Sequence, residues 1–417
     1  MKIRRWNSRR PQVELRLSMT VYAVSANLIA SVKYCTDTKD LRAMPSARML
    51  PSLTPLRGLA AVWVVVYHYN IWAPNAHLDA LSPIISKGYL AVDLFFMVSG
   101  FVMSHVYHRA FMRDLPGNYF RFIGARIARL YPLHVLILLL FVATALSSRT
   151  ADYVATGDFS PIPLTGARSI SAFFANLLML QGVKASELSW NYPAWSISVE
   201  FMAYLLFPLM LPLIWQAPPR LKAALAAILL GLLSYLMLLT NDYFNQWDGP
   251  TTLLRCMPEF ILGMLMYSLF RSGRLRHWMT TDAAAIGLFA ALLILLQIGT
   301  SDFLAVFLFA LLILAAVGND GYTTGVLNAA PLLWLGELSY SLYLAHGLVQ
   351  FAATQLLSAQ GFDNRGTISH LASLSLIGAM LLAAFGIAAL TYFTVERIGR
   401  RRLRRLFGLA KPKLAAG

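Results

Sequence analysis

The chain has 417 residues, of which 58% are hydrophobic and only 13% are charged, and its mean hydropathy is +0.60. A soluble domain of this length cannot cover its surface with so few charges, so the composition predicts an integral membrane protein. The net charge of +16 comes largely from arginines in short connections between apolar segments, which favours contact with anionic lipids over nucleic acid. Cys35 and Cys256 are the only two cysteines, too few for a disulfide framework or a cysteine-based metal site.

Residues 1–50 precede the first long apolar segment and are basic. Their stretch LSMTVYAVSANLIASV resembles a weak signal sequence, but cleavage there would put the start of the next segment on the wrong side of the membrane. Two interpretations remain: a disordered cytosolic extension, or a start codon assigned upstream of the true one, with Met44 and Met49 as alternatives. We expect a transmembrane domain over 51–400 and a basic cytoplasmic tail over 401–417.

Long apolar segments dominate the rest of the chain. A hydrocarbon core about 30 Å thick is crossed by roughly 20 apolar residues in a helix. The shorter stretch SISAFFANLLMLQ, near 170–182, is predicted to form a re-entrant or interfacial helix inside the connection 148–193. The sequence therefore predicts an all-α, polytopic transmembrane bundle of about ten helices, at 56–74, 88–108, 127–147, 194–215, 222–240, 252–271, 282–299, 301–318, 331–357 and 371–395.

Lysine and arginine collect in alternate connections between these segments. The connections after the second, fourth and sixth segments are basic, as is the tail RIGRRRLRRLFGLAKPK, whereas TNDYFNQWDGP and QIGTSD are acidic or nearly neutral. Alternating spans place all the basic connections on one side, and basic connections remain in the cytoplasm. Both termini are therefore predicted to face the cytoplasm.

The first segment, LRGLAAVWVVVYHYN, carries an arginine and a histidine on one helical face. Arg57 and His68 are eleven residues apart, which separates them by roughly 20° around the helix and about 16 Å along it. Charged groups at membrane depth are costly and persist when they are paired, solvated or useful. A snorkelling arginine and an interhelical hydrogen bond are the structural alternatives for these two residues.

Two carboxylates follow in later segments. Asp93 lies near the outer end of the second segment, and Glu200 near the outer end of the fourth. A buried carboxylate needs a cation or a proton, and His68 lies at a depth where it can pair with Asp93. A structural salt bridge is the alternative.

Polar side chains share a face in two further segments. Arg255 and Glu259 are four residues apart, and Ser339, Tyr343 and His346 are spaced i, i+4, i+7. A self-satisfied pair would explain the first set, and helix packing explains Ser339 better than Tyr343 and His346. Ionisable residues from five helices therefore converge on the central or outer half of the bundle and predict a polar cavity: His68, Asp93, Glu200, Arg255, Glu259 and His346.

A cationic cluster is predicted at the inner mouth of the third segment, RFIGARIARLYPLHV. It contains Arg126, Arg129 and Tyr131, and it lies next to Arg57. Such a cluster suits a phosphate-rich cytosolic ligand, although ordinary positive-inside residues would give the same pattern.

Taken in order, these segments match the signatures of one family. Arg57 and His68 form an arginine, ten-residue, histidine pattern, and GYLAVDLFFMVSGFVMS, RIARLYPLH, PAWSISVEFMAYLLFP, RCMPEFILGML and LGELSYSLYLAHGLV follow in register, with Glu396 in FTVERIGRR at the end. From about residue 53 to 400, the chain resembles the acyltransferase-3 family of integral-membrane O-acyltransferases.

The resemblance implies ten core transmembrane helices and transfer of an acyl group, usually acetyl from acetyl-CoA, to a carbohydrate or another hydroxylated acceptor. We accordingly expect an enzyme of the bacterial inner membrane that acts on a glycan such as exopolysaccharide or O-antigen. The expected partners are acyl-CoA, the acceptor and membrane lipids, without nucleic acid, metal or a permanently bound cofactor. The oligomeric state is left open.

Acyl transfer requires a base that takes the proton of the acceptor hydroxyl, and His68 is the candidate. Asp93 or Glu200 would orient it, and the sequence does not choose between them. Direct transfer and an acyl-histidine intermediate both remain open. The remaining candidates are Arg57, Arg126, Arg129 and Tyr131 for acyl-CoA binding, and Arg255, Glu259, Ser339, Tyr343 and His346 for substrate binding or oxyanion stabilisation.

The rival interpretation is a transporter or flippase that uses the buried acid and base groups as a proton relay. Transporters commonly contain two similar halves, and no such duplication is visible in the sequence. A purely structural membrane subunit is a third interpretation, and it predicts that the polar residues tolerate replacement.

Overall fold

The structure, a computed structural model, describes residues 50, 52–157, 165–184, 189–240, 249–299, 301–362 and 365–409, all within the unit Leu50–Gly417. The basic extension expected over 1–50 lies outside the described residues, apart from Leu50. The same holds for the end of the tail expected over 401–417. Every regular element within the described ranges is helical.

Ten helices in the described part of the chain have 16 or more residues, and each coincides with one of the predicted segments. This agreement follows from the apolar segments, whose backbone groups can find partners only within their own helix when water is absent. The helices are α2 (Leu53–Trp72), α5 (Ala91–Arg113), α6 (Leu115–Thr156), α9 (Trp195–Gln216), α10 (Pro219–Leu239), α11 (Thr252–Ser272), α13 (Asp282–Gln297), α14 (Asp302–Gly318), α16 (Ala330–Ser358) and α17 (His370–Thr391).

Two helices are longer than the sequence predicts. Helix α6 has 42 residues and replaces both the segment 127–147 and part of the connection on either side. The chain also stays helical after α17, first through a π-helix, η9 (Tyr392–Glu396), and then through α18 (Arg397–Leu406). The predicted bounds were set by runs of apolar residues. They therefore miss the polar and basic residues that continue a helix past the apolar run.

Short helices fill the connections. The predicted stretch near 170–182 forms α7 (Ile170–Leu177) and α8 (Gln181–Lys184), and the 3₁₀ turn η5 (Tyr192–Ala194) leads into α9. The other short helices are α3 (Leu78–Leu81), α4 (Pro83–Ser86), α12 (Arg276–Met279) and α15 (Tyr322–Leu327), with 3₁₀ turns η2 (Pro74–Ala76), η3 (Gly88–Leu90), η4 (Gly166–Arg168), η7 (Gly249–Thr251) and η8 (Arg365–Thr367).

Six helical stretches among the described residues are long and apolar enough to cross a membrane. Helices α2 and α16 are long enough but are not among the six, because both carry polar and ionisable side chains along their length. Helices α13 and α14 are apolar but shorter. The six stretches are Gly88–Arg113, Leu115–Ser147, Tyr192–Gln216, Pro219–Leu239, Gly249–Ser272 and His370–Leu406.

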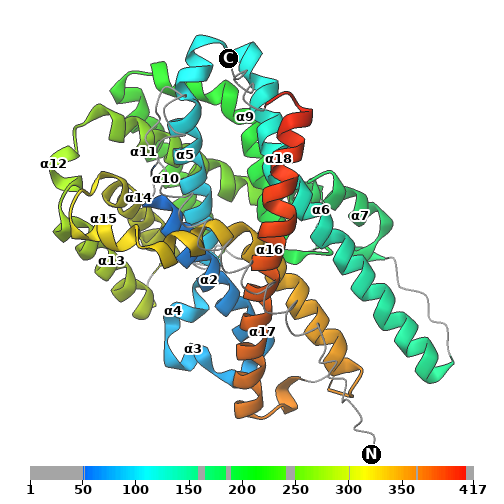
Figure 1. Ribbon diagram of the computed structural model, residues 1–417. Helices are drawn as coiled ribbons and strands as arrows, with labels where there is room; N and C mark the ends of the chain where they lie inside the picture. The colour runs from blue at the N-terminus through cyan, green and yellow to red at the C-terminus, as the bar shows by residue number, and fades with distance from the viewer. Residues whose placement is uncertain are drawn as a thin grey trace, which may run out of the picture. The chain divides into compact units, whose positions relative to one another are not determined.

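Close helix crossings place α2 and α5 inside the bundle (Figure 1). At the crossing of α2 and α16, a Cβ added to Gly58 would lie 2.7 Å from the backbone nitrogen of Gly336. At the crossing of α5 and α11, a Cβ on Gly100 would collide with the Phe260 carbonyl oxygen. Glycine at these positions lets the backbones approach, as is common between membrane helices.

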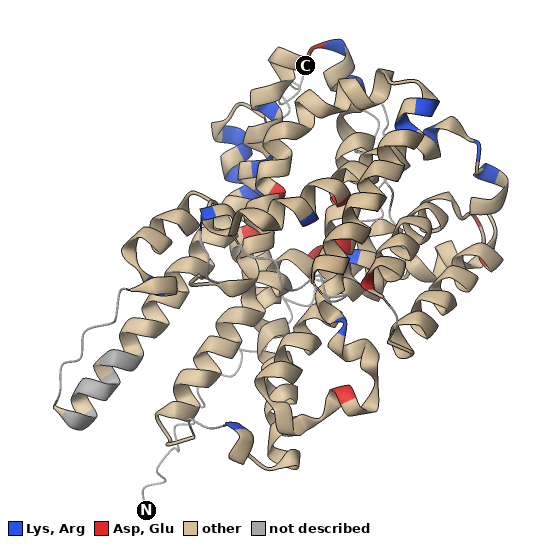
Figure 2. Ribbon diagram, turned by 180° about the vertical axis from the view of Figure 1, so that it is seen from behind, with Lys and Arg blue, Asp and Glu red and all other residues tan. Residues whose placement is uncertain are grey.

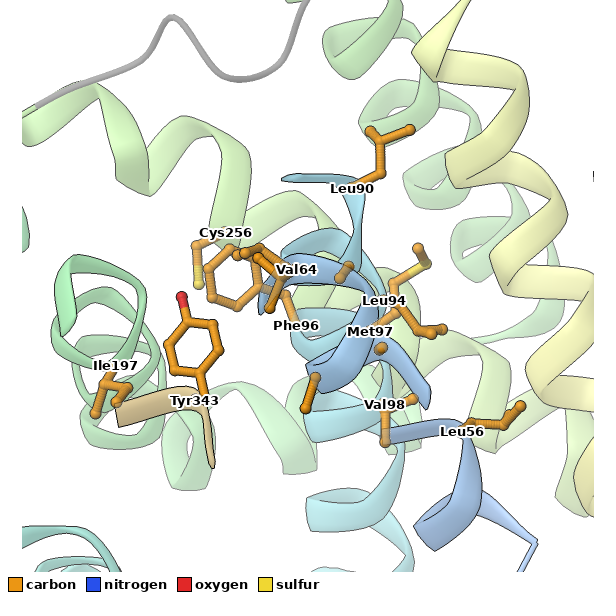
Figure 3. Packing of buried hydrophobic residues seen from close by; sticks show 14 of the residues in the cluster. Leu56, Val64, Leu90, Leu94, Phe96, Met97, Val98, Ile197, Cys256 and Tyr343 are labelled. Atoms are coloured by element: carbon orange, nitrogen blue, oxygen red, sulfur yellow. The ribbon is translucent and has the colours of Figure 1, made fainter. Parts of the chain in front are cut away.

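The core between these helices is continuous. Figure 3 shows Val64 of α2, Phe96 of α5, Cys256 of α11 and Tyr343 of α16 within one packed cluster. Large apolar side chains also cover the outside of the bundle; Leu213 is 74% exposed and Leu382 is 77% exposed. Figure 2 shows that the Lys and Arg residues gather mainly at the end of the bundle where α18 lies.

Candidate functional site

Two histidines from different helices meet at the centre of the candidate site. The Nδ1 atom of His68 on α2 lies 3.1 Å from Nε2 of His346 on α16, and the two rings stack with centroids 5.1 Å apart. His346 is fully buried, whereas His68 is partly exposed. No described residue forms a hydrogen bond with Nε2 of His68. The crossing at Gly58 and Gly336 brings the two helices close enough for this contact.

Tyrosine rings surround this histidine pair. The ring of Tyr192 lies 5.0 Å from that of His68, and the Tyr192 hydroxyl donates to Oε1 of Gln350 at 2.9 Å. The ring of Tyr343 lies 5.7 Å from that of His346, and its hydroxyl lies 2.7 Å from Oγ of Ser196. The i, i+4, i+7 pattern therefore places Tyr343 and His346 at the pair, as expected for one helical face.

Ser339, the first residue of that pattern, is not part of the histidine pair. Its hydroxyl is buried and has no hydrogen-bond partner among the described residues. The packing role considered from the sequence therefore remains the simplest explanation for Ser339.

Asp93 and Arg255 form a buried ion pair between α5 and α11. The Nε and Nη2 atoms of Arg255 donate to the two carboxylate oxygens of Asp93 at 2.7 and 2.6 Å, and Nη2 also donates to the Tyr89 carbonyl at 3.2 Å. The pairing of Asp93 with His68 considered from the sequence is therefore not formed. Arg255 satisfies both oxygens of the carboxylate, as bidentate arginine geometry allows.

Glu259 lies next to this pair and is fully buried. Neither of its carboxylate oxygens accepts a hydrogen bond from a donor in the described ranges, and its carboxyl group lies beside that of Asp93. The Arg255–Glu259 pair considered from the sequence is replaced by Arg255–Asp93, because the close approach of α5 and α11 brings a second carboxylate to the arginine.

Glu200 lies near Arg57, and its charge also acts on Tyr343 beside the histidine pair. Its Oε1 accepts a hydrogen bond from the Tyr204 hydroxyl at 2.7 Å, and that hydroxyl lies 2.7 Å from Oγ of Ser99. The charges of Glu200 and Arg57 are close enough to interact. The sequence left open whether Asp93 or Glu200 orients His68, and neither carboxylate forms a hydrogen bond with His68 in the described part of the chain.

The surroundings of Glu200 depend on how α9 begins inside the bundle. Helix α8 covers its first turn, where the Gly182 amide donates to Oγ of Ser198 at 3.1 Å and that hydroxyl donates to the Met179 carbonyl at 2.7 Å. The start of an apolar segment gives no sign that the preceding connection folds over it.

The three arginines of the predicted cationic cluster differ in their partners. Arg129 pairs with Glu396 of the π-helix, whose other oxygen accepts from Ser341 at 2.6 Å. Arg126 donates to the Tyr107 hydroxyl at 3.0 Å and lies over aromatic rings, and its buried Nε has no hydrogen-bond partner in the described ranges. Arg57 forms no hydrogen bond or ion pair with any described residue.

The charge of the cluster is therefore only partly balanced. Tyr131, the fourth residue assigned to it, packs against the core as a partly buried side chain. Arg400 of α18 interacts electrostatically with Arg126 and Arg129, so a fourth arginine joins the cluster from the C-terminal end.

Two site residues could not have been found from sequence periodicity. Tyr192 lies in the turn before α9, where no helical pattern exists, and Arg400 lies in the basic segment interpreted only as a tail. Glu396 was singled out only as part of a motif, and the π-helix gives it a partner in Arg129. An extra residue in a helical turn redirects side chains, which the sequence spacing alone does not show.

The fold and the site together define an integral membrane protein with buried polar and ionisable groups inside a helical bundle. Across residues 50–393 the chain matches the sequence profile of the acyltransferase-3 family, described as an acyltransferase domain. The chain belongs to this family, and the family resemblance found in the sequence is confirmed.

Several known proteins are similar to this chain. Acyltransferase MdmB of Streptomyces mycarofaciens is 28% identical over 393 residues, which cover 86% of this chain and 95% of MdmB. O-acetyltransferase OatA of Staphylococcus aureus is 27% identical over 340 residues, 74% of this chain and 52% of OatA. YrhL of Bacillus subtilis, named for peptidoglycan O-acetyl transfer, is 25% identical over 328 residues, 72% of this chain and 48% of YrhL.

The chain therefore spans nearly all of MdmB but only about half of OatA and YrhL. No solved structure matches the chain significantly.

Proposed function

We propose that this protein transfers an acyl group, most simply acetyl, from cytosolic acyl-CoA to a hydroxyl group of a carbohydrate, with His68 as the general base. The partly exposed ring of His68, with Nε2 free of described partners, is the single observation that supports this assignment most strongly. An unprotonated imidazole nitrogen is a suitable base for an alcohol near neutral pH.

The reaction proceeds by direct transfer. Nε2 of His68 takes the proton of the acceptor hydroxyl while the acceptor oxygen forms a bond to the thioester carbonyl carbon. The carbon–sulfur bond then breaks, and the leaving thiolate takes the proton back from Nε2. The products are the O-acyl ester and free CoA, and His68 ends in its starting state.

The donor enters from the end of the bundle where the arginines gather. Arg57 and Arg126 carry charge that no described carboxylate balances in an ion pair, and both suit the phosphates of CoA. About 16 Å of helix separates Arg57 from His68, a span that an extended pantetheine arm can follow. Arg129 is paired with Glu396, so we do not assign it a direct contact with the phosphates of CoA.

The topology follows from the same charge distribution. In this proposal, ten helices cross the membrane, and both termini of the transmembrane domain lie on the same side as the basic residues. By the positive-inside rule, this side is the cytoplasm. The asymmetry of Lys and Arg in Figure 2 supports this orientation. It places the CoA phosphates in the cytosol and the acceptor on the other side of the bilayer, in the bacterial inner membrane.

The carbohydrate acceptor is proposed from the relatives. OatA is named an O-acetyltransferase, and YrhL is named for transfer to peptidoglycan. This chain spans about half the length of OatA and of YrhL. The experiment below therefore compares different carbohydrate acceptors.

The proposal is tested with membranes that contain the protein, radiolabelled acetyl-CoA, and either peptidoglycan fragments or exopolysaccharide as acceptor. We expect alkali-labile label on the carbohydrate with the wild type, and a loss of at least about 10²-fold with His68→Ala, because the base is removed. His134→Gln is the matched control, since His134 is a buried histidine of α6 that contacts the Asn176 carbonyl and is not part of the histidine pair. Normal transfer by His68→Ala, in protein that is folded and inserted, would refute the base assignment.

A further inference from the structure

We infer that His346 is a positioning residue that accepts the Nδ1 proton of His68 and thereby keeps Nε2 of His68 free to act as the base. This inference rests on the proposed function. It replaces the carboxylate that was expected from the sequence with a second, neutral imidazole.

The geometry of the histidine pair defines the proton arrangement. Only one hydrogen fits between Nδ1 of His68 and Nε2 of His346 at 3.1 Å, so one nitrogen donates and the other accepts. If His346 donated, neutral His68 would carry its own hydrogen on Nε2 and could not take another proton there. The reactive tautomer is therefore the one in which His68 donates and His346 accepts.

Neither Asp93 nor Glu200 accepts the Nδ1 proton of His68. Both oxygens of Asp93 accept from Arg255, and Glu200 accepts from Tyr204 in the neighbourhood of Arg57. Among side chains in the described ranges, that of His346 forms a hydrogen bond with the imidazole of His68, and the Val64 backbone carbonyl, one turn earlier in α2, is a second acceptor for the same ring.

The surroundings hold His346 in a single position. Its backbone carbonyl accepts from the Tyr69 hydroxyl at 3.1 Å, and its ring is enclosed by those of Tyr192 and Tyr343 at centroid distances of 5.9 and 5.7 Å. The next residue, Gly347, leaves no room for a side chain, because a Cβ there would lie 2.8 Å from Oδ1 of Asn191. A fixed acceptor fixes the orientation of the donor ring, as the aspartate does in a serine protease triad.

The role is indirect throughout the reaction. When the acceptor hydroxyl loses its proton to Nε2, the hydrogen on Nδ1 of His68 stays in the bond to His346. The same hydrogen remains there when the thiolate of CoA takes the proton from Nε2. His346 stays neutral and does not touch the substrate.

The test compares two substitutions of His346 in the full-length protein in membranes, with kcat and KM measured separately for acetyl-CoA. His346→Leu fills the space without an acceptor, and we expect kcat to fall at least about 10²-fold while KM changes less than about threefold. His346→Gln places Oε1 near the former Nε2 position, and we expect it to keep kcat within about tenfold of the wild type. Equal losses in both variants, or near-normal kcat in His346→Leu, would overturn the inference.

A spectroscopic measurement keeps the inference testable if a variant does not fold. The ¹⁵N resonances of His68, assigned by their disappearance in His68→Ala, report which ring nitrogen carries hydrogen. We expect the Nδ1–H tautomer in the wild-type protein, and the Nε2–H tautomer there would overturn the inference.

The failure of this inference differs from the failure of the proposed function. A wild-type protein without transferase activity, or a fully active His68→Ala, would refute the proposed function itself. If the wild type is active and His68 is essential, but His346→Leu and His346→Gln have the same kcat, only the role of His346 is refuted. His134→Gln again serves as the control for loss of a buried histidine.

Discussion

The buried ionisable residues of this protein fall into two groups that differ in their partners. Asp93 and Arg255 are both buried, and the arginine engages both carboxylate oxygens. Arg57 and His68, both on α2, are partly exposed, and each has polar atoms that no described residue engages. The difference teaches that a charged residue in a membrane helix is not by itself a sign of chemistry. A group that keeps an accessible atom without a protein partner is the better indicator.

The largest effect that would separate the two groups is expected at the ion pair. Asp93→Asn removes the negative charge and leaves Arg255 buried without its counter-charge, which costs about 3–5 kcal/mol of folding free energy. We expect a large fall in the amount of folded protein and in its thermal unfolding temperature in detergent.

The comparison predicts that the surviving Asp93→Asn molecules still transfer acyl groups. Activity per folded molecule should stay within about tenfold of the wild type, since the pair lies outside the proposed proton path. Full stability combined with complete loss of turnover would assign Asp93 to the chemistry and break the comparison.

A smaller effect with the opposite signature is expected at Arg57. Arg57→Ala removes a cation that forms no hydrogen bond or ion pair with a described residue and interacts with Glu200 only beyond ion-pair distance, so the loss of stability should be small. The lost charge-assisted contacts to the CoA phosphates correspond to about 1.5–3 kcal/mol, or roughly a 10- to 100-fold rise in KM for acetyl-CoA.

Arg57→Lys is the matched variant, because it keeps the charge but loses the fork of donors, and its KM should lie between the other two. An unchanged KM in both variants would show that CoA binds elsewhere. A large loss of folded protein would instead place Arg57 with the structural group.

The smallest effect is expected at Tyr192. Tyr192→Phe keeps the ring beside His68 and removes only the hydroxyl that donates to Gln350. The expected cost is about 1 kcal/mol of stability, and kcat should change less than about threefold because the proposed reaction uses no proton from this hydroxyl. A much larger fall in kcat at unchanged stability would add Tyr192 to the catalytic groups. Thermal unfolding and transfer kinetics on the same preparation separate these outcomes.

Much of the fold follows from the sequence because lipid imposes a simple rule. Each long apolar segment became a helix, and most have nearly the predicted bounds, as in Thr252–Ser272 for 252–271. The extension of α6 and the π-helix before α18 were not predictable from hydropathy, since hydropathy shows where an apolar segment ends and not where its helix ends.

In the candidate site, the sequence predicted which side chains share a helical face but not which partners they meet. Helical spacing placed Tyr343 and His346 on one face correctly. The partner of Asp93 depends on the crossing of α5 and α11 at Gly100, and the position of Glu200 depends on how α8 covers the start of α9. Such contacts between distant segments leave no periodic signal in a single sequence.

The central claim is that the thioester reaches His68 from the arginine end of the bundle. It is tested most directly by an electron cryo-microscopy structure with a ketone analogue of acetyl-CoA, which binds but cannot transfer its acyl group. We predict phosphate density beside Arg57 and Arg126, and the analogue's carbonyl carbon near His68, with room for an acceptor oxygen within about 3–3.5 Å of that carbon. Phosphates bound away from these arginines, or a carbonyl group separated from His68 by packed side chains, would contradict it.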